Sequence, residues 1–233
     1  MSKISIIIPI FNEEMFIEKL LLKIKSVKLV GKFKKEIICI NDGSTDNSLK
    51  ILKKQKFIKI INQKNFGKGH AVQQGIKKAS GKYIIVQDSD LEYDPRDINK
   101  LLKVIILKRN SAVYGSRYLN YNIIKRLLLK NQSILTFIFN YILSLNFYLR
   151  HKIYITDLLT GYKMYPKVFF KKNKIKSKGF EADHEITLKL LKNKFKIREV
   201  PINYYPRSKK EGKKINFKDA LKALILINRN KYL

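Results

Sequence analysis

Short, continuous apolar runs, each followed by polar residues, constrain the fold of this chain more than any other feature of its sequence. They do not alternate between apolar and polar residues, which predicts strands buried on both faces. We expect strands at 4–9, 36–41, 57–62, 83–87 and 112–115. Amphipathic patterns between them predict helices at 13–28, 46–54, 68–79 and 97–108. This order is typical of an α/β domain with a mainly parallel sheet flanked by helices.

After Gly115 the pattern changes, and the second half is expected to complete the same domain. A long apolar stretch covers 127–149, and a further segment covers 156–166. The remaining predictions are a basic loop at 171–178, a helix at 181–192, a strand at 195–200 and a helix at 217–228. No internal repeat or long linker separates two domains. We therefore expect one domain with two functional halves, 1–118 and 119–233.

The charge balance of the chain points to an anionic partner. Lysine and arginine number 50 against 18 acidic residues, a net charge of +32. Lysine dominates and no nucleic-acid-binding module is present, so a basic nucleic-acid-binding protein is the least favoured interpretation. Five of the acidic residues fall within positions 88–97. The single cysteine, Cys39, lies in an apolar run, which predicts a buried thiol and a reducing compartment.

Three carboxylates follow the strand predicted at 83–87. Asp88, Asp90 and Glu92 alternate, so they are expected to point to one side. Such an array repels itself unless a cation compensates it, and hard oxygen ligands favour Mg²⁺ or Mn²⁺. Acidic residues also cap helices, and that reading fits Asp94 and Asp97 better.

Two other polar segments follow predicted strands. The sequence N-D-G-S-T-D at 41–46 is a turn in which Asp46 is expected to cap the next helix, whereas capping does not explain Asp42. The sequence N-F-G-K-G at 65–69 opens a helix but lacks the Gly-Lys-Ser/Thr of a P-loop. Because ligands bind at the carboxyl ends of parallel strands, all three segments are expected to meet at one site.

Together these motifs resemble family 2 glycosyltransferases of the GT-A fold. The resemblance rests on I-I-I-P-I-F-N-E-E at 6–14, N-D-G-S-T-D at 41–46, N-F-G-K-G-H-A at 65–71 and Q-D-S-D-L-E-Y-D-P at 87–95. Later segments are similar to dolichol-phosphate mannosyltransferases and other polyprenyl-phosphate glycosyltransferases. They are Y-G-S-R-Y at 114–118, T-D-L-L-T-G-Y-K at 156–163, G-F-E-A-D-H-E-I at 179–186 and V-P-I-N-Y-Y-P-R-S-K-K-E-G-K-K-I at 200–215.

The resemblance implies a role for individual residues. The nucleotide-sugar would be bound by Pro9, Phe11, Glu13, Asp42 and Asp88. The Mg²⁺ or Mn²⁺ ion would be held by Asp88, Asp90 and Glu92. The catalytic set would be Asp90, Arg117, Asp157 and Arg207, with the two arginines facing phosphates. Ser89 stands where alanine is common in the family, and Phe11 where tyrosine is frequent.

The expected activity is inverting transfer of a sugar from GDP-mannose or a UDP-sugar to a polyprenyl or dolichyl phosphate. An acceptor phosphate is already anionic, so no strong base is needed, and the fork of an arginine suits it. The alternative is transfer to a glycan hydroxyl in cell-envelope polysaccharide synthesis. It requires a carboxylate base, for which Asp157 and Asp183 are the candidates.

The apolar stretch bears on the acceptor and on localisation. The charge-free run at 134–149 spans about 24 Å as a helix, short of the roughly 30 Å of a bilayer core. Thr136, Asn140 and Ser144 form a narrow polar stripe on it. A helix within 123–150 lying in a membrane interface and a buried core helix both fit this pattern. The first places Phe139 and Leu143 outward and the protein at the cytoplasmic face of a membrane.

Neither end of the chain is expected to carry a targeting segment. The apolar run at 4–11 is short and is interrupted by Pro9. We also expect a form without the transmembrane segments that some relatives append.

Overall fold

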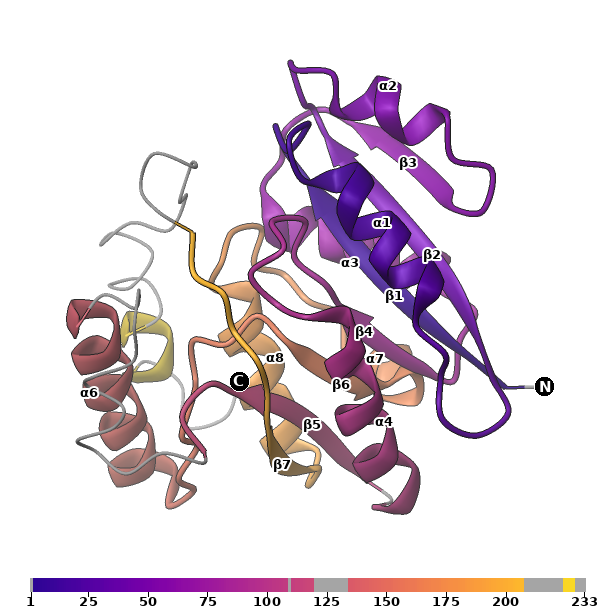
Figure 1. The fold of residues 1–233 in the computed structure, drawn as a ribbon. Coiled ribbons are helices and arrows are strands. Elements are labelled where there is room, and N and C mark those ends of the chain that lie inside the picture. Colours follow the sequence, from indigo (N-terminus) through magenta and orange to yellow (C-terminus); the bar gives the residue numbers. More distant parts are fainter. Residues whose placement is uncertain (1, 109, 120–133, 208–223, 229–233) are drawn as a thin grey trace.

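The computed structural model describes residues 2–108, 110–119, 134–207 and 224–228. A seven-stranded sheet forms its centre, with the strand order β3-β2-β1-β4-β6-β5-β7 (Figure 1). The strands are β1 (Ser2–Ile10), β2 (Phe33–Asp42), β3 (Lys59–Gln63), β4 (Tyr83–Val86), β5 (Ser111–Ser116), β6 (Lys163–Pro166) and β7 (Lys196–Pro201). Only the pairings of β6 with its two neighbours are antiparallel, so the prediction of a mainly parallel sheet is confirmed.

Helices cover both faces of this sheet, which explains why its strands are apolar on both sides. They are α1 (Ile17–Ser26), α2 (Ser48–Lys53), α3 (Lys68–Lys78), α4 (Ile98–Leu107), α6 (Ile134–His151), α7 (Lys167–Lys172) and α8 (Ala182–Lys192). In β1, Ile6 and Ile8 pack in one core with α1 and α4, whereas Ile7 packs on the other face with Ala71 of α3. Cys39 is buried in the first of these cores, as predicted.

The first helix begins later than the predicted residue 13. The backbone carbonyl of Glu13 accepts the N–H groups of Phe16 and Ile17 in a turn, and α1 starts only at Ile17. Hydrogen bonds to the 46–48 segment hold this turn in place. The Glu13 N–H donates to the Ser48 hydroxyl, and the Glu14 N–H donates to the Asp46 carboxylate. This arrangement leaves the Glu13 side chain at the carboxyl end of β1, away from the helix.

The second half differs most from the sequence prediction. Strand β6, within the segment 156–166, is antiparallel to both neighbours. The expected basic loop at 171–178 begins inside α7, because Phe169 anchors this short helix in the core. Helix α8 and strand β7 lie where they were predicted, to within one residue. Of the helix predicted at 217–228, the structure describes only 224–228, which is helical.

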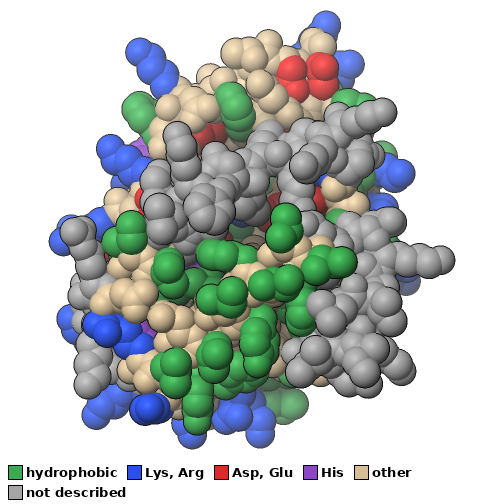
Figure 2. All heavy atoms as spheres, turned by 90° about the vertical axis from the view of Figure 1, so that its left-hand side faces the viewer, with side chains coloured by type: hydrophobic (Ala, Val, Ile, Leu, Met, Phe, Trp, Pro, Cys, Tyr) green, Lys and Arg blue, Asp and Glu red, His purple; other side chains and the backbone are tan. Residues whose placement is uncertain are grey.

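Helix α6 has a buried face and an exposed apolar face. Its buried face carries Asn140 and Ser144 beside Phe137, Leu143 and Phe147, so the polar stripe points into the protein. The expectation that Leu143 faces outward is wrong, since this side chain is fully buried in a core with α7 and α8. Figure 2 shows hydrophobic side chains gathered on this side of the molecule. The exposed apolar residues of α6 are Ile134, Leu135, Ile138, Tyr141, Ile142, Leu145, Tyr148 and Leu149.

Within the described ranges, no helix is both long enough and apolar enough to cross a membrane.

Candidate active site

A cavity of about 610 Å³ lies at the carboxyl ends of β1, β2 and β4. Parallel strands place their terminal loops at the same edge of the sheet, so motifs far apart in sequence meet here. Nearly all the predicted site residues line the cavity: Pro9, Phe11, Glu13, Asp42, Asp88, Asp90, Glu92, Arg117 and Arg207. Asp157 is the exception; it is buried behind Arg117.

Asp42, at the end of β2, organises the loop that leads into α3. Its carboxylate accepts the backbone N–H groups of Phe66 (3.0 Å) and Gly67 (2.9 Å), and the side-chain amide of Gln63 (2.6 Å). Gly67 has φ +95°, and a Cβ there would lie 2.8 Å from the carbonyl oxygen of Lys178. The N-F-G-K-G motif therefore needs glycine at this position because of its backbone conformation and the close approach of the 178–179 segment.

Lys68, the first residue of α3, forms an ion pair with the first of the clustered carboxylates. Its ammonium lies 2.6 Å from Asp88 Oδ1, and both side chains are mostly buried. Burial alone would lower the pKa of Lys68, but Asp88 and Asp183 raise it, so the side chain stays cationic. A Cβ on Gly161 would approach Asp88 Oδ2 to 2.6 Å, so the T-G-Y-K motif packs directly against this ion pair.

Arg207 forms ion pairs with Asp90, the second of the clustered carboxylates, and with Glu13. Its Nη2 lies 3.2 Å from Asp90 Oδ2, and its Nη1 lies 3.1 Å from Glu13 Oε2. Burial, followed by repulsion from Asp88 and Glu92, raises the pKa of Asp90 to about 7. Burial is thus the main reason why the charged form of Asp90 is disfavoured, and Arg207 offsets this effect only in part.

Glu92 faces the segment that follows β7. Its two carboxylate oxygens accept the Tyr204 hydroxyl (2.7 Å) and the backbone N–H of Arg207 (2.8 Å). Asp88 is therefore paired with Lys68, whereas Asp90 and Glu92 both contact Arg207. Among the described residues, no three acidic, histidine or cysteine side chains are arranged to hold a metal ion.

The carboxylates nevertheless fit a divalent cation in their chemistry. Asp88 and Asp90 both line the cavity, and each is met by a cationic side chain of the protein. Lys68 and Arg207 thus place positive charge beside the carboxylate oxygens that would bind a metal ion. Hard carboxylate oxygens are the donors that Mg²⁺ and Mn²⁺ prefer.

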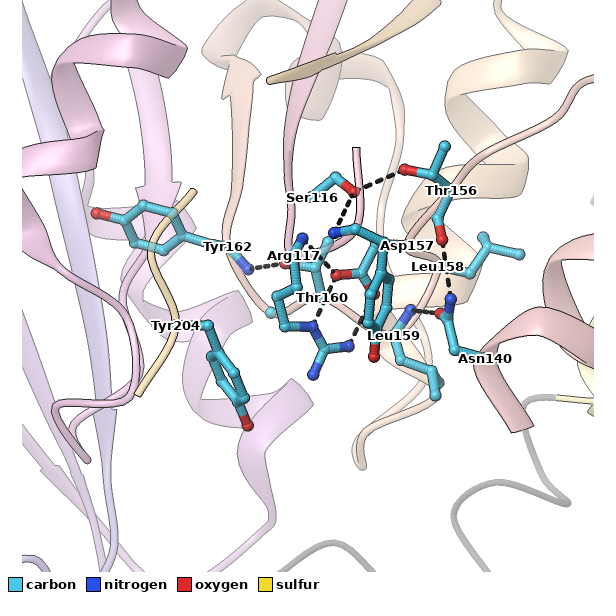
Figure 3. A network of polar contacts seen from close by, with 12 residues as sticks. Ser116, Arg117, Asn140, Thr156, Asp157, Leu158, Leu159, Thr160, Tyr162 and Tyr204 are labelled. Carbon is cyan, nitrogen blue, oxygen red and sulfur yellow. Dashed lines mark hydrogen bonds and ion pairs between the residues drawn. The ribbon is translucent and has the colours of Figure 1, made fainter. Parts of the chain in front are cut away.

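A second charged group, Arg117 with Asp157, lies on the side of α6 (Figure 3). Arg117 Nε and Nη2 donate to the two oxygens of Asp157, both at 2.7 Å, and the Arg117 backbone N–H adds a third bond. Burial alone would lower the pKa of Arg117, but Asp157 raises it. The guanidinium also lies 4.9 Å from the ring centre of Tyr204. Asp157 is fully buried in this pairing.

The loop at 156–160 that carries Asp157 is attached to both sides of the site. Glu199 of β7 accepts the backbone N–H groups of Thr156 and Asp157. Asn140 of α6 donates to the carbonyl of Thr156 at 2.8 Å and accepts the N–H of Leu159 (Figure 3). Asn140 of the polar stripe therefore joins α6 to the loop that holds Arg117.

The sequence predictions missed several residues that shape the cavity. Lys68 lies in the N-F-G-K-G motif. Its position at the start of a predicted helix, after the polar end of a strand, could have marked it as a residue of the site. Tyr204 contacts both Glu92 and Arg117; it lies in the motif at 200–215, but no role is predicted for it from the sequence. The capping role predicted for Asp94 is confirmed, because its side chain accepts the Arg96 N–H. Asp46 lies one residue before Asn47, the N-cap of α2, and its carboxylate accepts the N–H of Ser48, the first residue of that helix. Asp97 instead accepts the N–H of Asn203.

Comparison with known proteins identifies the family. The model of glycosyl transferase family 2 matches residues 5–172. The chain belongs to glycosyl transferase family 2. Its relatives in this family include the UDP-N-acetylglucosamine–dolichyl-phosphate N-acetylglucosaminyltransferase of Methanococcus voltae, with 29% identity over 221 residues, 85% of this chain and 84% of the relative.

Other known proteins resemble this chain in part of its sequence or in its fold. The undecaprenyl-phosphate 4-deoxy-4-formamido-L-arabinose transferase of Proteus mirabilis is 35% identical over 126 residues, 51% of this chain and 38% of that protein. Among solved structures, glucosyl-3-phosphoglycerate synthase from Mycobacterium tuberculosis in complex with Mn²⁺, UDP and glucosyl-3-phosphoglycerate superposes with a TM-score of 0.68. That match has 16% identity and covers 98% of this chain and 80% of the other. The family 2 assignment and the GT-A fold expected from the sequence are confirmed.

Proposed function

We propose that this family 2 glycosyltransferase moves a sugar from GDP-mannose or a UDP-sugar to a polyprenyl or dolichyl phosphate, with inversion at the anomeric carbon. The reaction takes place at the cytoplasmic face of a membrane. The relatives from Methanococcus voltae and Proteus mirabilis, whose names specify lipid-phosphate acceptors, support this substrate class. In this proposal residues 1–118 supply most of the donor site and residues 119–233 most of the acceptor site, except that Arg117 serves the acceptor and Arg207 contacts the donor-side carboxylates.

One observation carries the proposal: a fixed arginine and an apolar helix share the same cavity. Arg117 lines it, as do Leu135 and Phe139 of α6, and α6 continues outward into its exposed apolar face. A phosphate attached to a prenyl chain needs both a cation and an apolar path. The exposed face of α6 provides the path without a span through the bilayer, as an interfacial helix does.

On the donor side, the proposed roles follow the strand ends. Pro9, Phe11 and Asp42 line the part of the cavity assigned to the nucleotide. Asp88 and Asp90 would hold Mg²⁺ or Mn²⁺, with Glu92 beside them. The bound ion would supply Lewis-acid stabilisation of the leaving diphosphate.

On the acceptor side, Arg117 binds the lipid phosphate and orients one of its oxygens. That oxygen forms the new bond to the anomeric carbon while the bond from this carbon to the nucleoside diphosphate breaks. The oxygen is already anionic near neutral pH, so no strong base has to remove a proton. This agrees with Asp157 being fully buried and committed to Arg117.

A glycan hydroxyl remains the second candidate acceptor, because Asp183 also lines the cavity. This carboxylate lies at the start of α8 and is half-buried. A hydroxyl acceptor requires a base at such a position. Under the main proposal, Asp183→Asn retains transfer to lipid phosphate, whereas under the alternative it removes transfer to the glycan.

The test is a matrix of donors and acceptors. The protein is incubated with Mn²⁺, GDP-mannose or a panel of UDP-sugars, and either polyprenyl phosphate in liposomes or oligosaccharides. Mass spectrometry then identifies the products, with Asp90→Asn as the inactive control. A prenyl-phosphate-linked sugar is the expected product. Transfer to oligosaccharides alone would overturn the proposal in favour of the alternative.

A further inference from the structure

Arg207 lies among acidic side chains from three separate parts of the chain. Its guanidinium contacts Glu13, which follows β1, and Asp90, which follows β4. Its Nε lies 3.8 Å from Glu92 Oε1. Arg207 itself follows β7, more than a hundred residues further along the chain. One side chain thus supplies positive charge to carboxylates that would otherwise repel one another.

The segment 202–207 is held in this position through Glu92. The Tyr204 hydroxyl and the Arg207 N–H donate to its carboxylate, and the Tyr205 N–H donates to its backbone carbonyl at 2.8 Å. Tyr204 also pairs with Tyr93 in an isolated antiparallel bridge. These bonds keep the guanidinium over the carboxylates, and the Arg207 side chain is 9% exposed.

We propose that Arg207 is the chain's own counter-ion for the donor-side carboxylates, and that a divalent cation at Asp88 and Asp90 must displace it. Asp90 Oδ2, which Arg207 Nη2 contacts, is an oxygen that the cation would use. A guanidinium and a divalent ion repel each other when both lie within a few ångströms of one carboxylate. Binding of the metal and the placement of Arg207 are therefore competitive. This inference rests on the proposed metal dependence.

Lys68 and Arg207 differ in how closely they approach their carboxylates, at 2.6 Å from Asp88 and 3.2 Å from Asp90, respectively. Lys68 is the first residue of α3, and its side chain contacts Asp88. Its ammonium also lies 5.4 Å from the ring centre of Phe180. The guanidinium of Arg207 reaches Asp90 from a segment outside any helix or strand. Displacement of Arg207 leaves it near the entering diphosphate, where its paired N–H donors match phosphate oxygens.

The test measures Mn²⁺ binding without nucleotide. The full chain is titrated with Mn²⁺, and free Mn²⁺ is followed by its electron paramagnetic resonance signal. Arg207→Met is expected to bind Mn²⁺ about tenfold to hundredfold more tightly than the wild type, because the ion no longer displaces a charge-assisted pair. Arg207→Lys keeps the positive charge and is expected to bind Mn²⁺ close to the wild-type affinity.

Arg96→Met is the matched control. It removes the same charge from an exposed arginine whose partner, Asp94, does not line the cavity. We expect its Mn²⁺ affinity to stay within about twofold of the wild type, because exposed charges are screened. Thermal unfolding of each variant verifies its fold, and Arg207→Gln replaces Arg207→Met if the latter is unstable.

The outcomes separate this inference from the proposed function. If Arg207→Met binds Mn²⁺ no more tightly than the wild type, while Asp90→Asn loses binding, the counter-ion role of Arg207 is contradicted and the metal site stands. If neither the wild type nor Arg207→Met binds Mn²⁺ at millimolar concentration, both the metal site and the inference fall.

Discussion

The two sides of the cavity that we propose for the donor and the acceptor compensate charge in different ways. On the proposed donor side, Asp88 and Asp90 line the cavity and are in direct contact with Lys68 and Arg207. On the acceptor side, Arg117 and Asp157 form a bidentate pair that is almost entirely buried. The first arrangement leaves carboxylates that can exchange one cation for another. The second fixes one arginine in place before any substrate arrives.

An ion pair between a carboxylate and a cationic side chain therefore has a different role on each side of the cavity. A buried pair holds geometry, because breaking it leaves an uncompensated charge away from water. In the proposed mechanism, an ion pair beside the cavity holds its charges in place until a ligand replaces one partner. Neutralising a carboxylate should therefore damage activity on one side and stability on the other.

The largest expected effect is that of Asp90→Asn on activity. The substitution keeps the shape of the side chain and removes the charge on which the donor side depends. We expect transfer to fall at least about 10³-fold, comparable to the loss of a key electrostatic contact in other enzymes. The unfolding temperature should stay near that of the wild type, as measured by circular dichroism. Wild-type rates for this variant, even with a chelator present, would refute the metal assignment.

Asp157→Asn should do the reverse and chiefly affect stability. It leaves the Arg117 guanidinium buried with a neutral partner, which costs about 3–5 kcal/mol in comparable cases. Urea unfolding followed by circular dichroism measures this loss. Equal stability of Asp157→Asn and the wild type would show that the two sides do not differ as described.

Two neighbouring residues of α6 separate its buried face from its exposed one. Leu143→Asp places a carboxylate in the core and should destabilise the fold by several kcal/mol. Ile142→Asp lies on the exposed face, so the fold should persist while binding to anionic vesicles weakens, because apolar area is lost and negative charge is added. Thermal melting and vesicle co-sedimentation measure the two effects. Full vesicle binding by Ile142→Asp would count against membrane contact through α6.

Arg→Lys substitutions compare the two arginines directly. Arg117→Lys keeps the charge but loses the paired contact with Asp157, so transfer to a lipid phosphate should fall about tenfold to hundredfold. Arg207→Lys should lose less, since its contacts with Glu13 and Asp90 are single and longer. Steady-state kinetics with varied acceptor give the two values. An equal or larger loss for Arg207→Lys would reverse this ranking.

Glu36, a carboxylate outside the cavity, shows how much an ion pair with a purely structural role contributes to stability. Burial alone would raise the pKa of Glu36, but hydrogen bonds from Lys59, Ser5 and Ser80 lower it to about 2. Because this value lies below the ordinary pKa, the stabilisation is complete above about pH 4.5 and is lost as the pH falls toward 2.

Glu36→Gln should therefore lower the free energy of unfolding by about 2 kcal/mol at pH 7 and by less at pH 3. Denaturant unfolding at both pH values checks this. A difference that stays constant between them would mean that the charge of Glu36 contributes nothing.

Sequence reasoning succeeded where a local pattern determines structure. The apolar runs predicted the parallel strands, and the polar residues at their ends do meet at one cavity. It failed where long-range contacts decide orientation. Asn140 and Ser144 formed a polar stripe, but only the packed structure shows that both are buried and that Asn140 bonds the loop at 156–160. Glu92 accepts hydrogen bonds from Tyr204 and Arg207, and the residues next to Glu92 in the sequence do not predict these distant partners.

The central claim is that the acceptor is a lipid carrying a phosphate, and one pair of acceptors tests it most directly. With a donor found active in the matrix of donors and acceptors, the initial rate is measured for a polyprenyl phosphate and for the polyprenol of the same chain length, in identical liposomes. The account predicts transfer to the phosphate and none to the alcohol, because Arg117 binds the phosphate and no base deprotonates a hydroxyl. Equal rates with the two lipids would contradict it.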